Sequence, residues 1–181
     1  MDDRQSEEYS ALRATIRERG TARFVIFWLG LAAWAALVVV LVAVVPIPAA
    51  VLAPLLVLLA TFEAVHGLHI GVERIGRYLQ VFHRDEWERT AMALGRRFPG
   101  GGPDALFSAV FALAALVNLL PMSAAGPTPA EWIPLGLAHL LFLVRVHWAR
   151  RRAAGQRVQD LQRFEALAAA NFPDQPATDA R

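Results

Sequence analysis

Residues 24–45, FVIFWLGLAAWAALVVVLVAVV, form one apolar stretch without a charge in this 181-residue chain. At about 1.5 Å of rise per residue, a helix over this stretch covers the roughly 30 Å hydrocarbon core of a bilayer. The charged residues 1–23 precede it, and it is longer than the apolar region of a signal peptide. The stretch therefore predicts a membrane-spanning helix.

Three more apolar stretches follow, and the chain is 56% hydrophobic, above the roughly 45–50% of soluble domains. Proline-rich breaks separate them at PIP (46–48) and GPTPAE (126–131), and Pro121 is expected to end the third. We predict an all-α integral membrane protein with four transmembrane helices and cytoplasmic amphipathic helices. The membrane domain is expected over 24–146, with spans at about 24–45, 49–68, 104–120 and 130–148.

The arginines predict the orientation of the chain. All 18 basic residues are arginines, and they lie before the first span, between the second and third, or within and after the fourth. The other two connections contain none, which is the positive-inside pattern. We therefore expect a multi-pass protein of the cytoplasmic (inner) membrane with both termini inside. This topology explains the arginines, and the net charge is only +2. No nucleic-acid partner is therefore expected.

The parts outside the spans are predicted to be amphipathic helices. Residues 1–23 are expected to form one that ends at Gly20, and a helix over 86–98 is expected because the chain must turn back near Phe82 or His83 to reach the third span. Asp85 and Glu88 resemble a capping box for this helix. Residues 147–170 are expected to extend the fourth span and pack against helix 86–98, before a disordered tail over 171–181. The arginines expected at lipid headgroups are Arg13, Arg17, Arg74, Arg77, Arg150, Arg151 and Arg152.

Polar residues at membrane depth mark the candidate sites. In TFEAVHGLHIGVERIGRYLQ (61–80), four of them, Glu63, His66, His69 and Glu73, fall within an arc of about 120° of a helix. Glu63 lies about 20 Å below the outer end of its span, where an unpaired charge costs at least a few kcal/mol. Arg145 and His147 lie at similar depth and are its candidate partners. Asn118 and His139 both lie about 10 Å deep and are expected to share a hydrogen bond.

The Glu63 cluster has several interpretations. The first is a polar network between helices. The second is a metal site formed by Glu63, His66, His69, Glu73 and His147, because Glu63 and His66 have the Glu-x-x-His spacing of di-iron bundles. That pattern needs a second Glu-x-x-His and further carboxylates, which the sequence lacks. Haem ligation by His66 or His69 with His147 is a third, and a proton or ion path, or a lipid or small-molecule site, is a fourth. No cofactor is expected under the first interpretation, and a metal or haem under the second and third.

The functional prediction follows from what the chain lacks as well as from what it contains. There is no cysteine, phosphate loop, nucleophile elbow or zinc-protease helix. The sequence favours a non-enzymatic scaffold or accessory subunit that binds anionic lipid, a membrane protein partner or further copies of itself. The alternatives are a metal- or haem-binding redox protein and an oligomeric proton-coupled transporter or channel.

Overall fold

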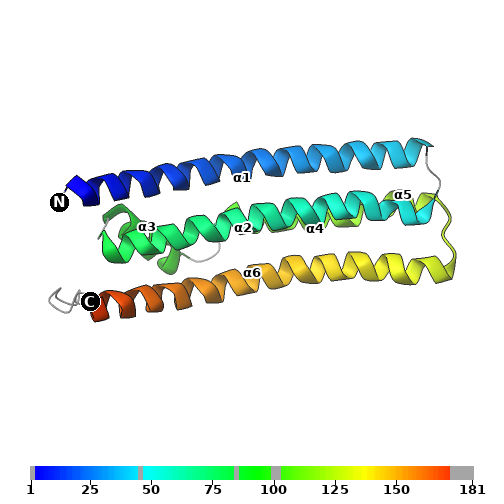
Figure 1. Ribbon diagram of the computed structural model, residues 1–181. Helices are drawn as coiled ribbons and strands as arrows, with labels where there is room; N and C mark the ends of the chain where they lie inside the picture. The colour runs from blue at the N-terminus through cyan, green and yellow to red at the C-terminus, as the bar shows by residue number, and fades with distance from the viewer. Residues whose placement is uncertain (1–2, 45–46, 84–85, 99–102, 172–181) are drawn as a thin grey trace.

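The computed structural model describes residues 3–44, 47–83, 86–98 and 103–171, and these residues form helices and short connections without a strand. A 3-10 helix, η1, precedes the second long helix. The elements are α1 (Asp3–Val44), η1 (Pro48–Val51), α2 (Leu52–Phe82), α3 (Glu86–Arg97), α4 (Pro103–Val117), α5 (Leu119–Ala124) and α6 (Pro129–Asn171), drawn in Figure 1.

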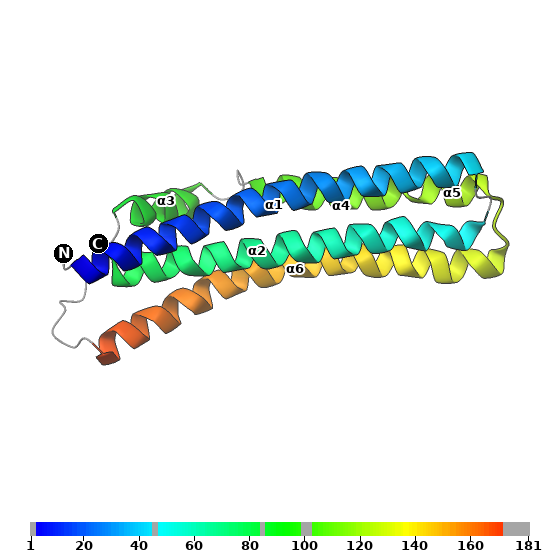
Figure 2. The ribbon, with the colours of Figure 1, turned by 45° about the horizontal axis from the view of Figure 1, so that its top comes forward.

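The long helices lie lengthwise beside one another and alternate in direction along the chain (Figures 1 and 2). The start of α1 and the end of α6 lie at one end of the bundle, and the η1 and α5–α6 connections lie at the other. Helix α2 is central, because it contacts α1, α3, α4 and α6. Within the described residues, four helical segments are long and apolar enough to cross a membrane: Asp3–Val44, Pro48–Phe82 (η1 and α2), Phe107–Ala124 (α4 and α5) and Pro129–Ala170.

The bundle has two parts. We call residues 24–44, 48–68, 107–124 and 129–148 the apolar section. We call residues 3–23, 69–82 and 149–171, together with α3, the stalk. Three long helices, α1, α2 and α6, run through both parts without interruption.

Aromatic rings hold the centre of the apolar section together. Phe111 of α4 lies edge-on to Phe27 of α1 and to Phe62 of α2, at centroid distances of 5.7 and 5.3 Å. Phe62 also meets Phe142 of α6 at 6.2 Å, so one cluster joins four helices. Edge-to-face geometry is the favourable arrangement for such pairs.

The outer surface of the apolar section is itself apolar. Large side chains such as Leu29, Leu113 and Leu141 are exposed on three different helices. Soluble monomers rarely expose continuous apolar surface on this scale. A multi-pass membrane protein is therefore the class that the fold suggests, in agreement with the lengths and compositions of the four helices.

Helix α1 does not end at Gly20, contrary to the prediction. It continues as one helix from Asp3 to Val44. A glycine inside a helix costs only about 1 kcal/mol relative to alanine. Helix α1 contacts α2 on both sides of this position, at Glu8 and at Gly30. Tertiary packing therefore maintains the helix through Gly20.

Pro121 does not end the third apolar helix either. Helix α4 stops at Val117, and α5 continues past Pro121 to Ala124. Pro121 lies in the first turn of α5, where backbone N–H groups have no partner within the helix. A proline is tolerated there because it removes no helical hydrogen bond.

Helix α3 returns the chain toward α4. Helix α2 ends at Phe82 and α3 covers Glu86–Arg97, within a residue of the expected bounds. The 14 residues of α2 beyond position 68 rise about 20 Å, and the 12 residues of α3 rise about 18 Å, so the second distance offsets the first. The predicted capping residue Asp85 and the side chain of Glu88 lie outside the described residues.

The end of α6 packs against α2 and not, as predicted, against α3. Phe164 of α6 lies edge-on to Tyr78 and Phe82 of α2, at 5.9 and 6.2 Å. Among the described elements, α3 contacts α2 alone. The tail expected over 171–181 lies outside the described residues except for Asn171, the last residue of α6.

Candidate functional site

Glu63 pairs with Arg145 across α2 and α6. Arg145 Nη2 donates to Glu63 Oε2 at 2.7 Å, and the guanidinium also lies 5.8 Å from the centroid of the Phe62 ring. Both side chains of the pair are about two-fifths exposed, at 42% and 40%. His147, the other candidate partner, is two residues from Arg145 and therefore lies on a nearly opposite face of α6, where it is exposed. The pair supplies the counter-charge that Glu63 requires at this depth.

Asn118 and His139 form a buried cross-link near the other end of the bundle. Asn118 Nδ2 lies 3.0 Å from His139 Nε2 and donates to the carbonyl of Val51 at 2.9 Å. His139 Nδ1 lies 2.8 Å from the carbonyl of Leu135, which can only accept, so Nδ1 carries the proton and Nε2 accepts from Asn118. Both hydrogens of the Asn118 amide are therefore used. The arrangement joins η1, the α4–α5 junction and α6, and the sequence analysis expected its Asn118–His139 bond.

His66 and His69 lie where the apolar section meets the stalk. The His66 ring stacks on Phe62 at a centroid distance of 5.7 Å. His69 Nδ1 lies 2.8 Å from Arg23 Nη1 of α1. Because arginine can only donate, Nδ1 accepts, and a neutral His69 carries its proton on Nε2. That atom lies 3.4 Å from Glu73 Oε1.

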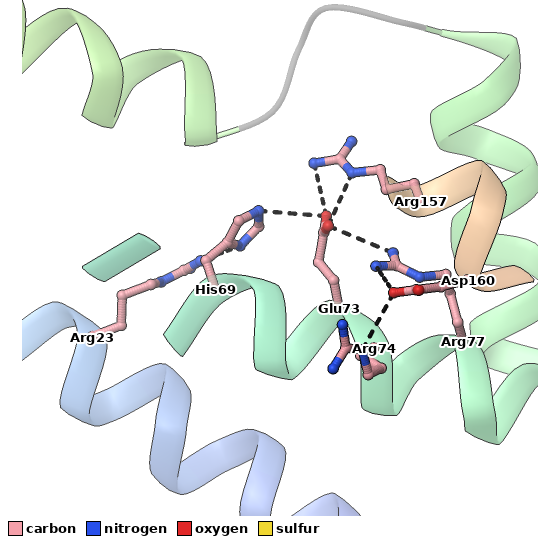
Figure 3. A network of polar contacts seen from close by, with 7 residues as sticks. All are labelled: Arg23, His69, Glu73, Arg74, Arg77, Arg157 and Asp160. Atoms are coloured by element: carbon pink, nitrogen blue, oxygen red, sulfur yellow. Dashed lines mark hydrogen bonds and ion pairs between the residues drawn. The ribbon is translucent and has the colours of Figure 1, made fainter. Parts of the chain in front are cut away.

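Glu73 is the centre of an ion-pair network between α2 and α6 (Figure 3). Arg157 binds it with two nitrogens, Nη2 to Oε1 at 2.7 Å and Nε to Oε2 at 3.0 Å. Arg77 Nη1 lies 3.5 Å from Glu73 Oε2, while Arg77 Nη2 lies 3.7 Å from Asp160 Oδ2. Arg77 thus bridges two carboxylates, and two-point contacts such as that of Arg157 also fix the orientation of the helices.

Two features of this network were missed at the level of sequence. Arg77 was expected at lipid headgroups, but it is only 1% exposed and lies between α2 and α6. Asp160, 5% exposed, was not singled out, although it is the one acid in the arginine-rich segment 145–163. Its isolation among arginines was the available signal. The other arginine of α2, Arg74, is half exposed and pairs with Asp160 at 3.4 Å.

The remaining arginines expected at headgroups lie on the outside of the stalk. Arg17, Arg150 and Arg151 are exposed. Arg13 lies over the ring of Tyr9 at 5.6 Å, and Arg152 lies over Trp148 at 4.8 Å. In both contacts the arginine and the aromatic ring belong to the same helix.

Helix α1 is tied to the stalk by a hydrogen bond to α2. Tyr78 Oη donates to Glu8 Oε1 at 2.7 Å. Burial, with this hydrogen bond as a second cause, raises the pKa of Tyr78 to about 12. The hydroxyl therefore remains a donor at physiological pH. Tyr78 lies ten residues along α2 beyond position 68, about 15 Å from the end of the apolar section.

Three of the five residues expected to bind a metal are bound by arginines. Glu63 is bound by Arg145, Glu73 by Arg157, and His69 by Arg23. Within the described part of the chain, no three His, Asp or Glu side chains are grouped closely enough to hold a metal ion. Comparison of the chain with models of protein families, with curated proteins and with solved structures finds no match.

Proposed function

We propose that the chain is a multi-pass protein of the cytoplasmic membrane, with both termini and α3 on the cytoplasmic side. The support is that the arginines among the described residues occur in the stalk or in the last turns before it, while the two connections at the opposite end contain none in the sequence. Positive residues flanking membrane helices are retained on the cytoplasmic side. The stalk then stands in the cytoplasm and the apolar section crosses the bilayer.

Within that membrane the protein acts as a non-enzymatic scaffold or accessory subunit, and its stalk binds a partner protein. One observation carries this proposal: α3 contacts α2 alone among the described elements, while Leu94 on α3 and Phe98 directly after it remain exposed. Their spacing of four residues places them on one helical face. Such a face fits a partner helix or groove, in which apolar side chains serve as anchors.

The charged residues of the stalk support a structural role. Glu73, Arg77, Arg157 and Asp160 bind one another across α2 and α6. A rigid support of this kind lowers the conformational entropy that the stalk loses when α3 binds a partner. The partner that the chemistry of α3 favours is another membrane protein with an apolar cytoplasmic helix. A second copy of the chain is the competing occupant.

Orientation can be tested cleanly because the chain contains no cysteine. Single cysteines at the exposed positions Ser10, Ser123 and Gln162 would be labelled with a membrane-impermeant maleimide in intact and permeabilised cells. Ser123 should react in intact cells, and Ser10 and Gln162 only after permeabilisation. The reverse pattern would refute the orientation.

The partner surface can be tested by cross-linking in intact membranes. Leu94→Cys lies on the exposed apolar face of α3, and Ala93→Cys, also exposed, serves as a matched control on a different face. A cross-linked product specific to Leu94→Cys is expected, heavier than the 19.8 kDa chain and different from twice that mass. A product at the mass of two chains would instead assign the face to self-association. Equal products from both variants, or none, would refute the partner surface.

A further inference from the structure

A groove of about 540 Å³ runs along the outside of the apolar section, between α2 and α6. Helix α2 lines it with Leu52, Leu55, Leu56, Leu59 and Glu63, and α6 lines it with Ala138, Leu141, Phe142 and Arg145. The lining residues recur every three or four positions, so each helix offers one face to the groove. From Leu52 to Glu63 the groove is about 16 Å long, at about 1.5 Å of rise per residue.

The ion pair of Glu63 and Arg145 lies at the end of the groove nearer the stalk. Both side chains are about two-fifths exposed even though each binds the other. In the proposed membrane placement Glu63 lies about 20 Å below the outer end of its span, so this exposed part faces hydrocarbon in a single copy of the chain. Charged groups that face hydrocarbon are costly. A cover that offers both an anion and a cation at the same depth would stabilise the pair.

The charges at the groove are complementary to themselves under a two-fold rotation. Helices α2 and α6 run in the same direction, and the bond of 2.7 Å places Glu63 and Arg145 at one level (Figure 1). A two-fold axis along the bilayer normal leaves every residue at its own level and brings α2 of one copy opposite α6 of the other. Glu63 then faces the partner's Arg145, and Arg145 faces the partner's Glu63. The four charges alternate in sign around the axis.

The sizes of the side chains along the groove fit the same rotation. Two helical turns from the ion pair, about 10 Å away, α2 carries Leu56 and α6 carries Ala138. These two residues share a level because the helices run in the same direction. Leu56 is 63% exposed, whereas the small side chain of Ala138 is partly buried. Across the two-fold axis each Leu56 meets the partner's Ala138, and small residues of this kind let membrane helices approach closely.

We propose that this groove is the interface at which two copies of the chain associate in the membrane, with α2 of each copy against α6 of the other. The proposal rests on the proposed membrane placement, in which the apolar section lies in lipid and both copies share one orientation. Packing at Leu56 and the alternating charges hold the dimer, because lipid provides no hydrophobic force between helices. An acyl chain could fill the apolar part of the groove, but it would leave Glu63 and Arg145 facing hydrocarbon.

Disulfide cross-linking in membranes tests the arrangement, because the chain contains no cysteine. Two full-length chains with different tags are co-expressed, one carrying Leu56→Cys and the other Ala138→Cys. Oxidation should join the two tags in a product of twice 19.8 kDa. In the matched control Leu140→Cys replaces Ala138→Cys, because Leu140 is exposed on α6 and does not line the groove. Equal yields from both combinations, or the absence of a product that carries both tags, would overturn the proposal.

The strength of association is measured by analytical ultracentrifugation of the purified protein in a mild detergent. Leu56→Ala removes an exposed side chain, so the fold of one copy should be unaffected. It should raise the dissociation constant of the dimer about tenfold, because the interface loses this side chain twice. Leu140→Ala is the control and should leave the constant unchanged. Equal constants for the two variants, or a wild type that stays monomeric, would overturn the proposal, and phospholipid retained by the monomer would assign the groove to an acyl chain.

A pair of charge reversals tests the proposed contacts of the ion pair. Glu63→Arg places two cations at the end of the groove, and Arg145→Glu places two anions there. Neither variant should dimerise alone, whereas a mixture should form a dimer with one copy of each, because all charges across the axis are then opposite. A mixture that associates no better than its components would overturn the charge pairing. If either variant fails to fold, Leu56→Ala decides the question.

These tests are separate from those of the proposed function. Reversed maleimide labelling would turn both copies over together and would leave the dimer intact. A monomeric wild type that still gives the Leu94→Cys product would refute the dimer and leave the surface of α3 standing. A dimer without a Leu94→Cys product would do the opposite.

Discussion

The apolar section and the stalk consist of the same three long helices but are held together by different chemistry. In the apolar section, aromatic rings such as Phe62 and Phe111 meet edge-on, and Asn118 binds His139. In the stalk, Arg77 and Arg157 bind carboxylates across α2 and α6. In the proposed placement the apolar section lies in lipid, which provides no hydrophobic force between helices, so packing and hydrogen bonds hold it. The stalk then lies in water, which suits charged contacts, and the chemistry changes between Glu63 and Glu73 along α2.

The largest effect is expected from Arg77→Met in the stalk. Removing this buried guanidinium leaves Asp160 and Glu73 with one cation fewer in a poorly solvated place, which should cost about 3–5 kcal/mol of stability. Thermal unfolding of the purified protein in detergent measures it. Arg74→Gln is the control, because Arg74 is half exposed and its pair should contribute less than about 1 kcal/mol. Similar losses in both variants would mean that burial of Arg77 is not what holds the stalk.

The next largest effect is expected from Gly30→Leu in the apolar section. A Cβ on Gly30 of α1 would overlap the side chain of Thr61 on α2, so the two helices would have to separate. Overpacking of this kind costs about 1–3 kcal/mol. Gly20→Leu on the same helix is the control, because a Cβ there meets nothing within 4 Å. If the two variants unfold at the same temperature, close contact at Gly30 does not stabilise the apolar section.

A smaller effect is expected from Glu63→Gln at the boundary between the two parts. The substitution leaves Arg145 without its carboxylate, but the half-exposed guanidinium can turn toward the interface, so the loss should be about 1–2 kcal/mol. The double variant Glu63→Gln with Arg145→Met removes both charges and should recover part of the stability. Unfolding of all three variants and the wild type forms a double-mutant cycle. A coupling of zero would show that the pair contributes nothing at this depth.

The two parts also differ in how far they could be predicted from sequence. Apolar length and depth along a helix depend on local sequence alone. The end of α2 near Phe82 and the Asn118–His139 hydrogen bond could therefore be predicted. The burial of Arg77 depends on how α6 is rotated against α2, which no local pattern specifies. The same reason explains why Asp160 was overlooked and why α6 was expected against α3. The continuity of α1 through Gly20 was missed because packing against α2 overrides local propensity.

The smallest effect is expected from Tyr78→Phe, at the outer part of the stalk. It removes the hydrogen bond to Glu8, and because Glu8 can turn to water the loss should be about 0.5–1 kcal/mol near neutral pH. The loss should also depend on pH. The pKa of Tyr78 is raised from 10.0 to about 12, so between these values the unfolded chain releases a proton that the folded chain keeps, and wild-type stability falls as pH rises. The advantage of the wild type over Tyr78→Phe should therefore be complete below pH 10 and shrink toward pH 12. Unfolding of both proteins across this range measures it, and an advantage independent of pH would mean that the stalk does not hold Tyr78 in its protonated form.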